Sequence, residues 1–277
     1  MGDRFLELLL LSPPTPPVDP SPSPASILLD PYGYLSAREN DTTAGGFTNA
    51  GHLIRVTFWV AVPPRASCFT VHCPALNPSA LGDFPTVVTT EEDLALLRVA
   101  ICRRGDHLYP NNIDYFVYQA GTAARTQPAL HPLPTAPDPC FSGGDAVLLP
   151  CRDRGMFFVA ILRPRLSMCD QFRYDLQLYN SETRTWICKL VYSPEDFEIT
   201  SKVITIGGEL GLVGWVDLWR GILIYDVLLD NDNLRYIPLP LPGVPRPLRG
   251  PADRVRDVIV AEGYIKYFDI EGRYDYV

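Results

Sequence analysis

The sequence lacks the features that place a chain across a membrane or in the secretory pathway. No stretch approaches the roughly 20 apolar residues of a membrane helix. The apolar run Leu8–Leu11 follows Glu7 and is cut off by Pro13 and Pro14, unlike the continuous apolar core of a signal peptide. We therefore expect no membrane partner and, by elimination, a protein of the cytoplasm or nucleus.

Cysteine and histidine are scarce and scattered. The seven cysteines are an odd number without C-x-x-C spacing, which predicts reduced structural thiols rather than a disulfide framework or a zinc site. Cys68, His72 and Cys73 come nearest to a metal cluster, but on a strand Cys73 faces away from the other two. We predict no metal site and no cofactor.

Recognisable catalytic motifs are also missing. The four histidines lie far apart, so catalysis would need folding alone to bring one to a partner. The glycine-rich turn Ile206–Gly211 has neither a Walker lysine nor a G-x-G-x-x-G pattern. The acids Glu91, Glu92 and Asp93 are adjacent and point in different directions on any regular element. We predict no catalytic residue and no enzymatic activity.

Basic residues are fewer than acidic residues in this chain. The chain has 24 lysines and arginines against 32 acidic residues, a formal net charge of -8. Such a field repels phosphate backbones, so we expect no nucleic-acid partner. Hydrophobic residues make up 47% and charged residues 20%, a composition typical of a globular protein.

The sequence is organised as a short leader and a long folded part. Residues 1–26 form a Pro/Ser-rich leader that favours extended, disordered conformations. From residue 27 to 277 we expect one domain, because β-branched and aromatic runs bounded by turn residues predict strands. Thr90–Val99 combines an N-cap candidate, acids and helix formers, which predicts a short helix unless its end, Leu96–Cys102, is a strand.

A hairpin unit recurs along the folded part, reading as a strand, a polar turn and a second strand. Its first strands are Tyr115–Ala120, Tyr174–Tyr179, Ile222–Val227 and Tyr264–Ile270. The later units recur at steps of about 46 and 43 residues, which is within the usual period of a propeller blade. Further strand-like stretches precede them, giving four strands a blade. One hairpin cannot bury its apolar face alone, so we predict an all-β, propeller-like repeat of antiparallel blades.

Trp215, Asp217, Trp219 and Arg220 form the candidate binding constellation. Tryptophan and arginine dominate binding hot spots, so these residues could contact a protein partner. In the structural alternative, the tryptophans fill the core between blades while Asp217 and Arg220 tie turns. The sequence leaves both interpretations open.

The same residues carry a family resemblance. Gly214–Leu228, Leu234–Pro240 and Arg256–Val260 resemble the hallmark of a large plant family, the domain of unknown function 1618, over about residues 214–277. Stretches upstream resemble the region that precedes this domain: Ser26–Asp30 with Gly33 and Tyr34, Val62–Ser67, Val71–Pro74 and Asp114–Ala120.

The resemblance implies a fold but no chemistry. It implies an architecture like that of propeller-like domains attached to F-box proteins, and it defines no catalytic residues. Similar members continue well beyond the position of Asp269, so a ring-closing fold would be incomplete in this chain.

We therefore hypothesise a non-enzymatic protein-interaction module that binds an unknown protein through loops at one end of the blades. Two alternatives stay open: a hydrolase-type enzyme with its site in a central channel, and a substrate adaptor that resembles the receptor half of F-box proteins without the F-box.

Overall fold

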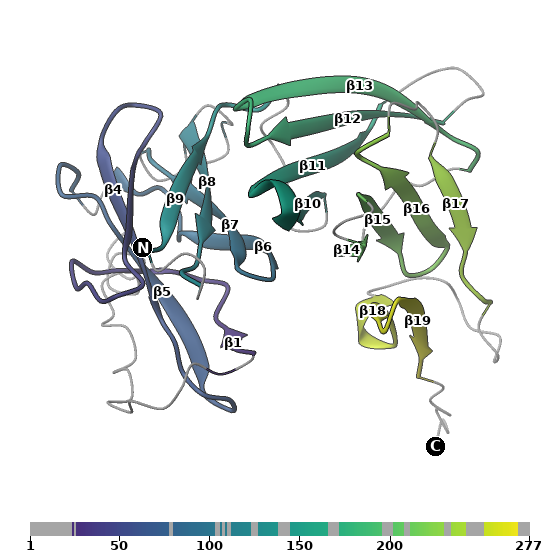
Figure 1. Cartoon of the computed structure of the whole chain (residues 1–277), viewed down its shortest axis with the longest axis horizontal. Helices are drawn as coiled ribbons and strands as arrows, with labels where there is room; N and C mark the ends of the chain where they lie inside the picture. The colour runs from purple at the N-terminus through teal and green to yellow at the C-terminus, as the bar shows by residue number, and fades with distance from the viewer. Residues whose placement is uncertain are drawn as a thin grey trace. The chain divides into compact units, whose positions relative to one another are not determined.

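The structure is a computed structural model, and its strands confirm the all-β prediction (Figure 1). Nearly all of the predicted leader, including residues 1–23, lies outside the described residues. The chain divides into two compact units, residues 1–140 and 141–277, which are treated separately below. The described residues are 24, 26–77, 80–102, 106, 109, 112–122, 127–137, 145–165, 172–195, 202–207, 211–229, 234–241 and 252–270.

The N-terminal unit contains two sheets around one core. The first has the order β1-β5-β4-β3, with β2 also paired to β5, and the second is the meander β6-β7-β8-β9. Ile54 and Phe69 of the first sheet share a buried cluster with Leu97 and Phe116 of the second. The strands are β1 (Leu28–Leu29), β2 (Tyr34–Leu35), β3 (Ala44–Phe47), β4 (Leu53–Trp59), β5 (Ala66–His72), β6 (Thr86–Glu91), β7 (Leu94–Ala100), β8 (Ile113–Gln119) and β9 (Ala129–Leu133).

Of the two interpretations of this segment, the short helix over Thr90–Val99 is wrong, and the alternative strand over Leu96–Cys102 is largely correct, since β7 spans Leu94–Ala100. The segment forms the end of β6, a two-residue turn at Glu92 and Asp93, and most of β7. Strand β7 lies between β6 and β8 and is buried on both faces, which explains its nearly continuous apolar run. Burial in the sheet overrides the helix propensity of the leucines and alanines.

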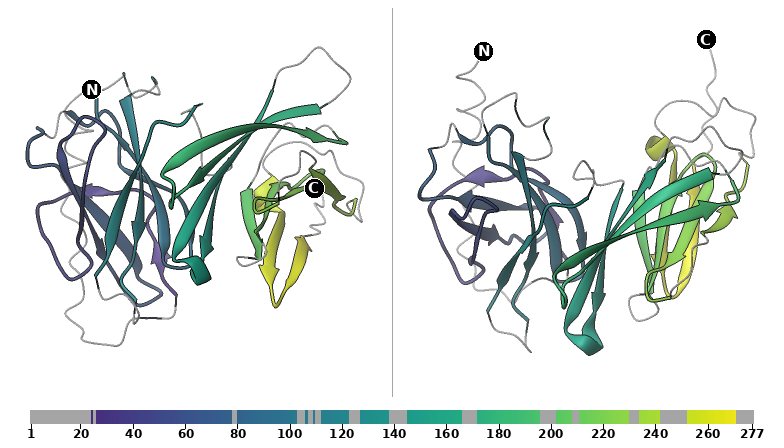
Figure 2. Two further views of the ribbon diagram at one scale, coloured as in Figure 1. Left: turned by 45° about the horizontal axis from the view of Figure 1, so that its top comes forward. Right: turned by 90° about the horizontal axis from the view of Figure 1, so that it is seen from above.

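The C-terminal unit consists of consecutive antiparallel sheets. Two have four strands in chain order, and the described part of the third has two (Figures 1 and 2). A 3₁₀ turn precedes β11 (η4, Arg152–Arg154) and another precedes β18 (η5, Ala252–Arg254). The strands are β10 (Ala146–Cys151), β11 (Met156–Pro164), β12 (Phe172–Asn180), β13 (Thr185–Ser193), β14 (Lys202–Gly207), β15 (Leu212–Asp217), β16 (Gly221–Asp226), β17 (Arg235–Pro238), β18 (Arg256–Ala261) and β19 (Tyr264–Asp269).

The first strands of successive sheets lie side by side, with β14 beside both β10 and β18 (Figure 1). The Thr205 hydroxyl donates to the Leu148 carbonyl at 3.2 Å, and the Lys202 ammonium contacts the Asp257 carboxylate at 2.8 Å. One apolar cluster joins the β10–β13 and β14–β17 sheets, and another joins β14–β17 to β18–β19. This is the face-to-face packing expected of propeller blades.

The predicted repeat is correct in kind, and within the described residues its last unit is shifted by one strand. Tyr118, Tyr179 and Tyr225 all lie on the third strand of a four-stranded sheet, as the alignment requires. Phe268 lies on β19, the second strand in the described part of its sheet. Alternating apolar patterns on neighbouring strands look alike, so the sequence could not separate the second strand of a blade from the third.

Candidate functional site

Trp215 lies in the core rather than on a surface. It occupies the middle of β15, its side chain is fully buried, and it belongs to the cluster between the β10–β13 and β14–β17 sheets. Its indole N–H donates to the Asp145 carbonyl at 2.8 Å, so its polar atom is satisfied. The structure places this residue as the core-filling interpretation requires, and its indole is not exposed to a partner.

Asp217 organises the turn between β15 and β16. Its carboxylate is almost completely buried and accepts the backbone N–H groups of Trp219 at 2.8 Å and Arg220 at 3.2 Å. Gly221 follows directly, where a Cβ atom would lie 2.6 Å from the Ile237 carbonyl oxygen. Two features therefore fix the conformation of this loop. The Asp217 carboxylate closes the turn, and Gly221 allows β17 to approach closely.

Arg220 has a fixed backbone and an accessible side chain. Its carbonyl accepts the Tyr236 hydroxyl at 2.9 Å and the Leu239 N–H at 3.0 Å. The guanidinium is 43% exposed and lies 3.8 Å from the Asp217 carboxylate. Burial, together with the carboxylates of Glu195 and Asp217, raises the pKa of the Tyr236 phenol, which therefore remains a protonated donor at neutral pH.

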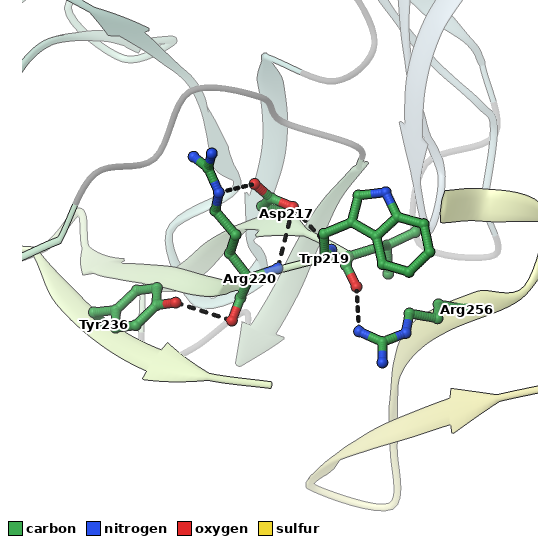
Figure 3. A network of polar contacts seen from close by, with 6 residues as sticks. Asp217, Trp219, Arg220, Tyr236 and Arg256 are labelled. Atoms are coloured by element: carbon green, nitrogen blue, oxygen red, sulfur yellow. Dashed lines mark hydrogen bonds and ion pairs between the residues drawn. The ribbon is translucent and has the colours of Figure 1, made fainter. Parts of the chain in front are cut away.

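Arg256, on β18, completes the site, and sequence reasoning gave it no role (Figure 3). Its guanidinium is fully buried and donates to the Leu218 carbonyl at 3.2 Å and the Pro240 carbonyl at 3.4 Å. It also pairs with the Asp269 carboxylate at 3.0 Å and lies 5.1 Å from the centre of the Trp219 ring. One side chain thus joins the β15–β16 turn, the segment after β17, and the end of β19.

Two exposed apolar residues follow hydrogen-bond partners of this arginine in the chain. Leu241 follows Pro240 and is 82% exposed, and Ile270 follows Asp269 and is 65% exposed. We group them with the partly exposed Trp219 and Arg220 as the Arg256 end surface, defined as Trp219, Arg220, Leu241 and Ile270, because each is, or follows closely in the chain, a residue that contacts the Arg256 guanidinium. The fold thus brings Asp217, Trp219 and Arg220 together and leaves Trp215 apart. The arrangement offers two exposed apolar side chains and the partly exposed Arg220 cation, next to segments that the buried Arg256 joins by hydrogen bonds.

The other residues considered in the sequence lie in the N-terminal unit, elsewhere in the C-terminal unit or outside the described residues. Within the described ranges, no group of three histidine, cysteine or acidic residues is placed to hold a metal ion. Burial is the main cause that raises the pKa of both Cys68 and Cys73 to about 11, so both thiols stay protonated at neutral pH. His107, Cys140, Cys169 and residues 208–210 of the glycine-rich turn are outside the described residues.

Comparison with known proteins supports the resemblance carried by this part of the chain. Among the described helices, none is long and apolar enough to span a membrane. No curated protein and no solved structure matches the sequence. Residues 215–276, which contain the β15–β16 turn, Arg256 and Asp269, match the family described as a protein of unknown function (DUF1618).

Proposed function

We propose that this chain is a non-enzymatic protein-interaction module and that the Arg256 end surface contacts the partner. The observation that carries the proposal is the exposure of Leu241 and Ile270, each directly after a residue that the fully buried Arg256 guanidinium holds by a hydrogen bond. Burying a leucine or isoleucine side chain contributes about 1.5–3 kcal/mol, so covering both would stabilise a complex substantially.

The support beneath this surface favours binding with little reorganisation. The Arg256 guanidinium fixes the Pro240 carbonyl and the Asp269 carboxylate, the groups next to the two exposed side chains. Preorganised surfaces lose less conformational entropy when a partner docks. Trp219 and Arg220 supply the residue types that most often carry binding energy.

The exposed groups of this surface favour particular side chains in a partner segment. Leu241 and Ile270 require an apolar side chain, and the 43% exposed Arg220 guanidinium favours a carboxylate next to it. We propose a protein segment in which an apolar residue is flanked by an acidic one. On the family resemblance, we propose a plant protein with a fold related to F-box-associated domains. Its place in the cytoplasm or nucleus is proposed by elimination.

The test combines capture with direct binding. The tagged full chain is used to capture proteins from plant tissue, and each captured protein is purified and titrated against the chain by isothermal calorimetry. Leu241→Asp with Ile270→Asp should weaken a genuine complex by at least about tenfold, and Trp219→Ala with Arg220→Ala should weaken it as well.

Ile187→Asp is the matched control, because Ile187 is a 46% exposed apolar residue on β13 and lies outside the proposed surface. Circular dichroism establishes that each variant is folded. A purified partner that binds all the variants equally well would refute the proposed surface, and the absence of any direct partner would refute the interaction function.

A further inference from the structure

The N-terminal unit contains a cavity of about 450 Å³ that is bordered by both of its sheets. The lining comes from the segment before β1, the end of β4, the β6–β7 hairpin and the end of β8. The volume falls within the usual range of small-molecule pockets. The cavity shares no residue with the Arg256 end surface, so a ligand bound there would be a function separate from the proposed partner binding.

Part of the wall is built from core side chains. Phe58, Leu94 and Tyr118 line the cavity and are almost completely buried. The Phe58 and Tyr118 ring centroids lie 4.4 Å apart, and Phe58 also stacks on Phe69 at 5.6 Å. Close packing in the core holds these side chains in place, so this part of the cavity is preformed.

Hydrogen bonds join the two sheets at this wall. The Tyr118 hydroxyl on β8 donates to the Thr42 carbonyl at 2.7 Å, and the Thr42 hydroxyl accepts the N–H of Phe58 on β4 at 2.9 Å. These polar groups bond within the protein, so the wall offers a ligand mainly aromatic and aliphatic surface.

Other residues of the lining are in contact with solvent. Ile27 and Val60 are each 39% exposed, and Ser26 and Thr90 are exposed as well. A ligand that covers the two aliphatic side chains removes apolar surface from water, which favours binding. The hydroxyls of Ser26 and Thr90 can each exchange a water molecule for a polar group of the ligand.

We propose that this cavity binds a neutral, mainly apolar small molecule that carries one hydroxyl group. The hydrocarbon or aromatic body lies against the buried wall, and the hydroxyl, which both donates and accepts, bonds to Ser26 or Thr90. Glu92 and Asp93 also line the cavity, but both residues interact with other groups of the protein. The Asp93 carboxylate, for example, accepts a hydrogen bond from the Gln119 amide at 3.3 Å. The lining therefore does not require a cationic ligand.

The test uses three probes with one common body: 4-phenylbutanol, butylbenzene and 4-phenylbutylamine. Each is titrated into the full chain and displaces the neutral fluorescent probe N-phenyl-1-naphthylamine. Ser26→Ala with Thr90→Val should reduce the affinity for the alcohol by about three- to tenfold, the effect of one hydrogen bond, and leave that for butylbenzene unchanged. Thr89→Val, on the same strand but outside the lining, should change neither affinity.

A second variant tests the cavity rather than the hydroxyl. Val60→Trp adds bulk to an exposed side chain of the lining and should weaken the binding of the alcohol and of butylbenzene by at least about tenfold. Val62→Trp, at a 49% exposed residue outside the lining, should leave both unchanged, and melting temperatures show that both variants are folded. Tighter binding of the amine than of the alcohol, or an alcohol affinity insensitive to the Ser26 and Thr90 changes, would overturn the ligand class. Binding of no probe, or binding unaffected by Val60→Trp, would overturn the site.

Discussion

Replacing Arg256 by methionine should cost a large part of the stability of the fold. The substitution keeps most of the aliphatic volume but leaves the Asp269 carboxylate, which is only 13% exposed, without its cation. The carbonyls of Leu218 and Pro240 lose their donor as well. Removing one member of a buried ion pair typically costs about 3–5 kcal/mol, so we expect a loss of that size from a total stability of about 5–15 kcal/mol.

Lys202→Met provides the control, because Lys202 also connects β14 to β18. Its contact with Asp257 is 2.8 Å long, but the two side chains are 34% and 51% exposed. Exposed pairs contribute about 1 kcal/mol or less, so this variant should remain close to the wild type. Urea unfolding of the full chain, followed by fluorescence and circular dichroism, measures both variants by linear extrapolation.

A double variant distinguishes two causes of the stability loss: the loss of the Arg256 charge beside the Asp269 carboxylate and the lost packing of the Arg256 side chain. Arg256→Met combined with Asp269→Asn removes the uncompensated carboxylate, so it should be more stable than Arg256→Met alone. If Arg256→Met lost no more stability than Lys202→Met, the argument that burial makes this pair important would be refuted.

Three other outcomes follow from single positions. Gly221→Ala should destabilise the chain by more than about 1 kcal/mol, because the new Cβ would lie 2.6 Å from the Ile237 carbonyl oxygen; an unchanged melting temperature would contradict this. Arg184→Gly should stabilise it by about 0.5–1 kcal/mol, because Arg184 is exposed and has a left-handed φ of 57°; urea unfolding measures the gain, and a loss would count against the reasoning. At pH 8 iodoacetamide should modify the exposed Cys188 well before Cys68. Burial raises the pKa of Cys68 to about 11, so its reactive thiolate accumulates only as the pH rises towards 11; equal rates at pH 8 by peptide mass spectrometry would be inconsistent with this.

The strand pattern was predictable because it depends on local alternation. The β-branched and aromatic run Leu53–Trp59 is β4, and Ile222–Val227 supplies most of β16, since such residues bounded by turns rarely adopt another structure. Thr90–Val99 was not predictable, because a strand buried on both faces and an apolar helix have similar compositions. Only its position between β6 and β8 decided the outcome.

The candidate site was predictable in part. The composition of the β15–β16 turn identified Asp217, Trp219 and Arg220, but it could not say that Trp215 would be fully buried while Arg220 would remain accessible. The burial of a side chain depends on which sheets pack together. The contact of β14 with β10 and β18 cannot be predicted from the residues of any one of these strands.

The sequence by itself determined the β-rich class, the four-strand unit and the residues of one turn, because these depend on side chains that are neighbours along the chain. Tertiary structure alone decided the role of Arg256, whose three hydrogen-bond partners lie 13 to 38 residues away. An arginine in a strand is ordinarily exposed, and only the meeting of three segments around its guanidinium makes burial favourable.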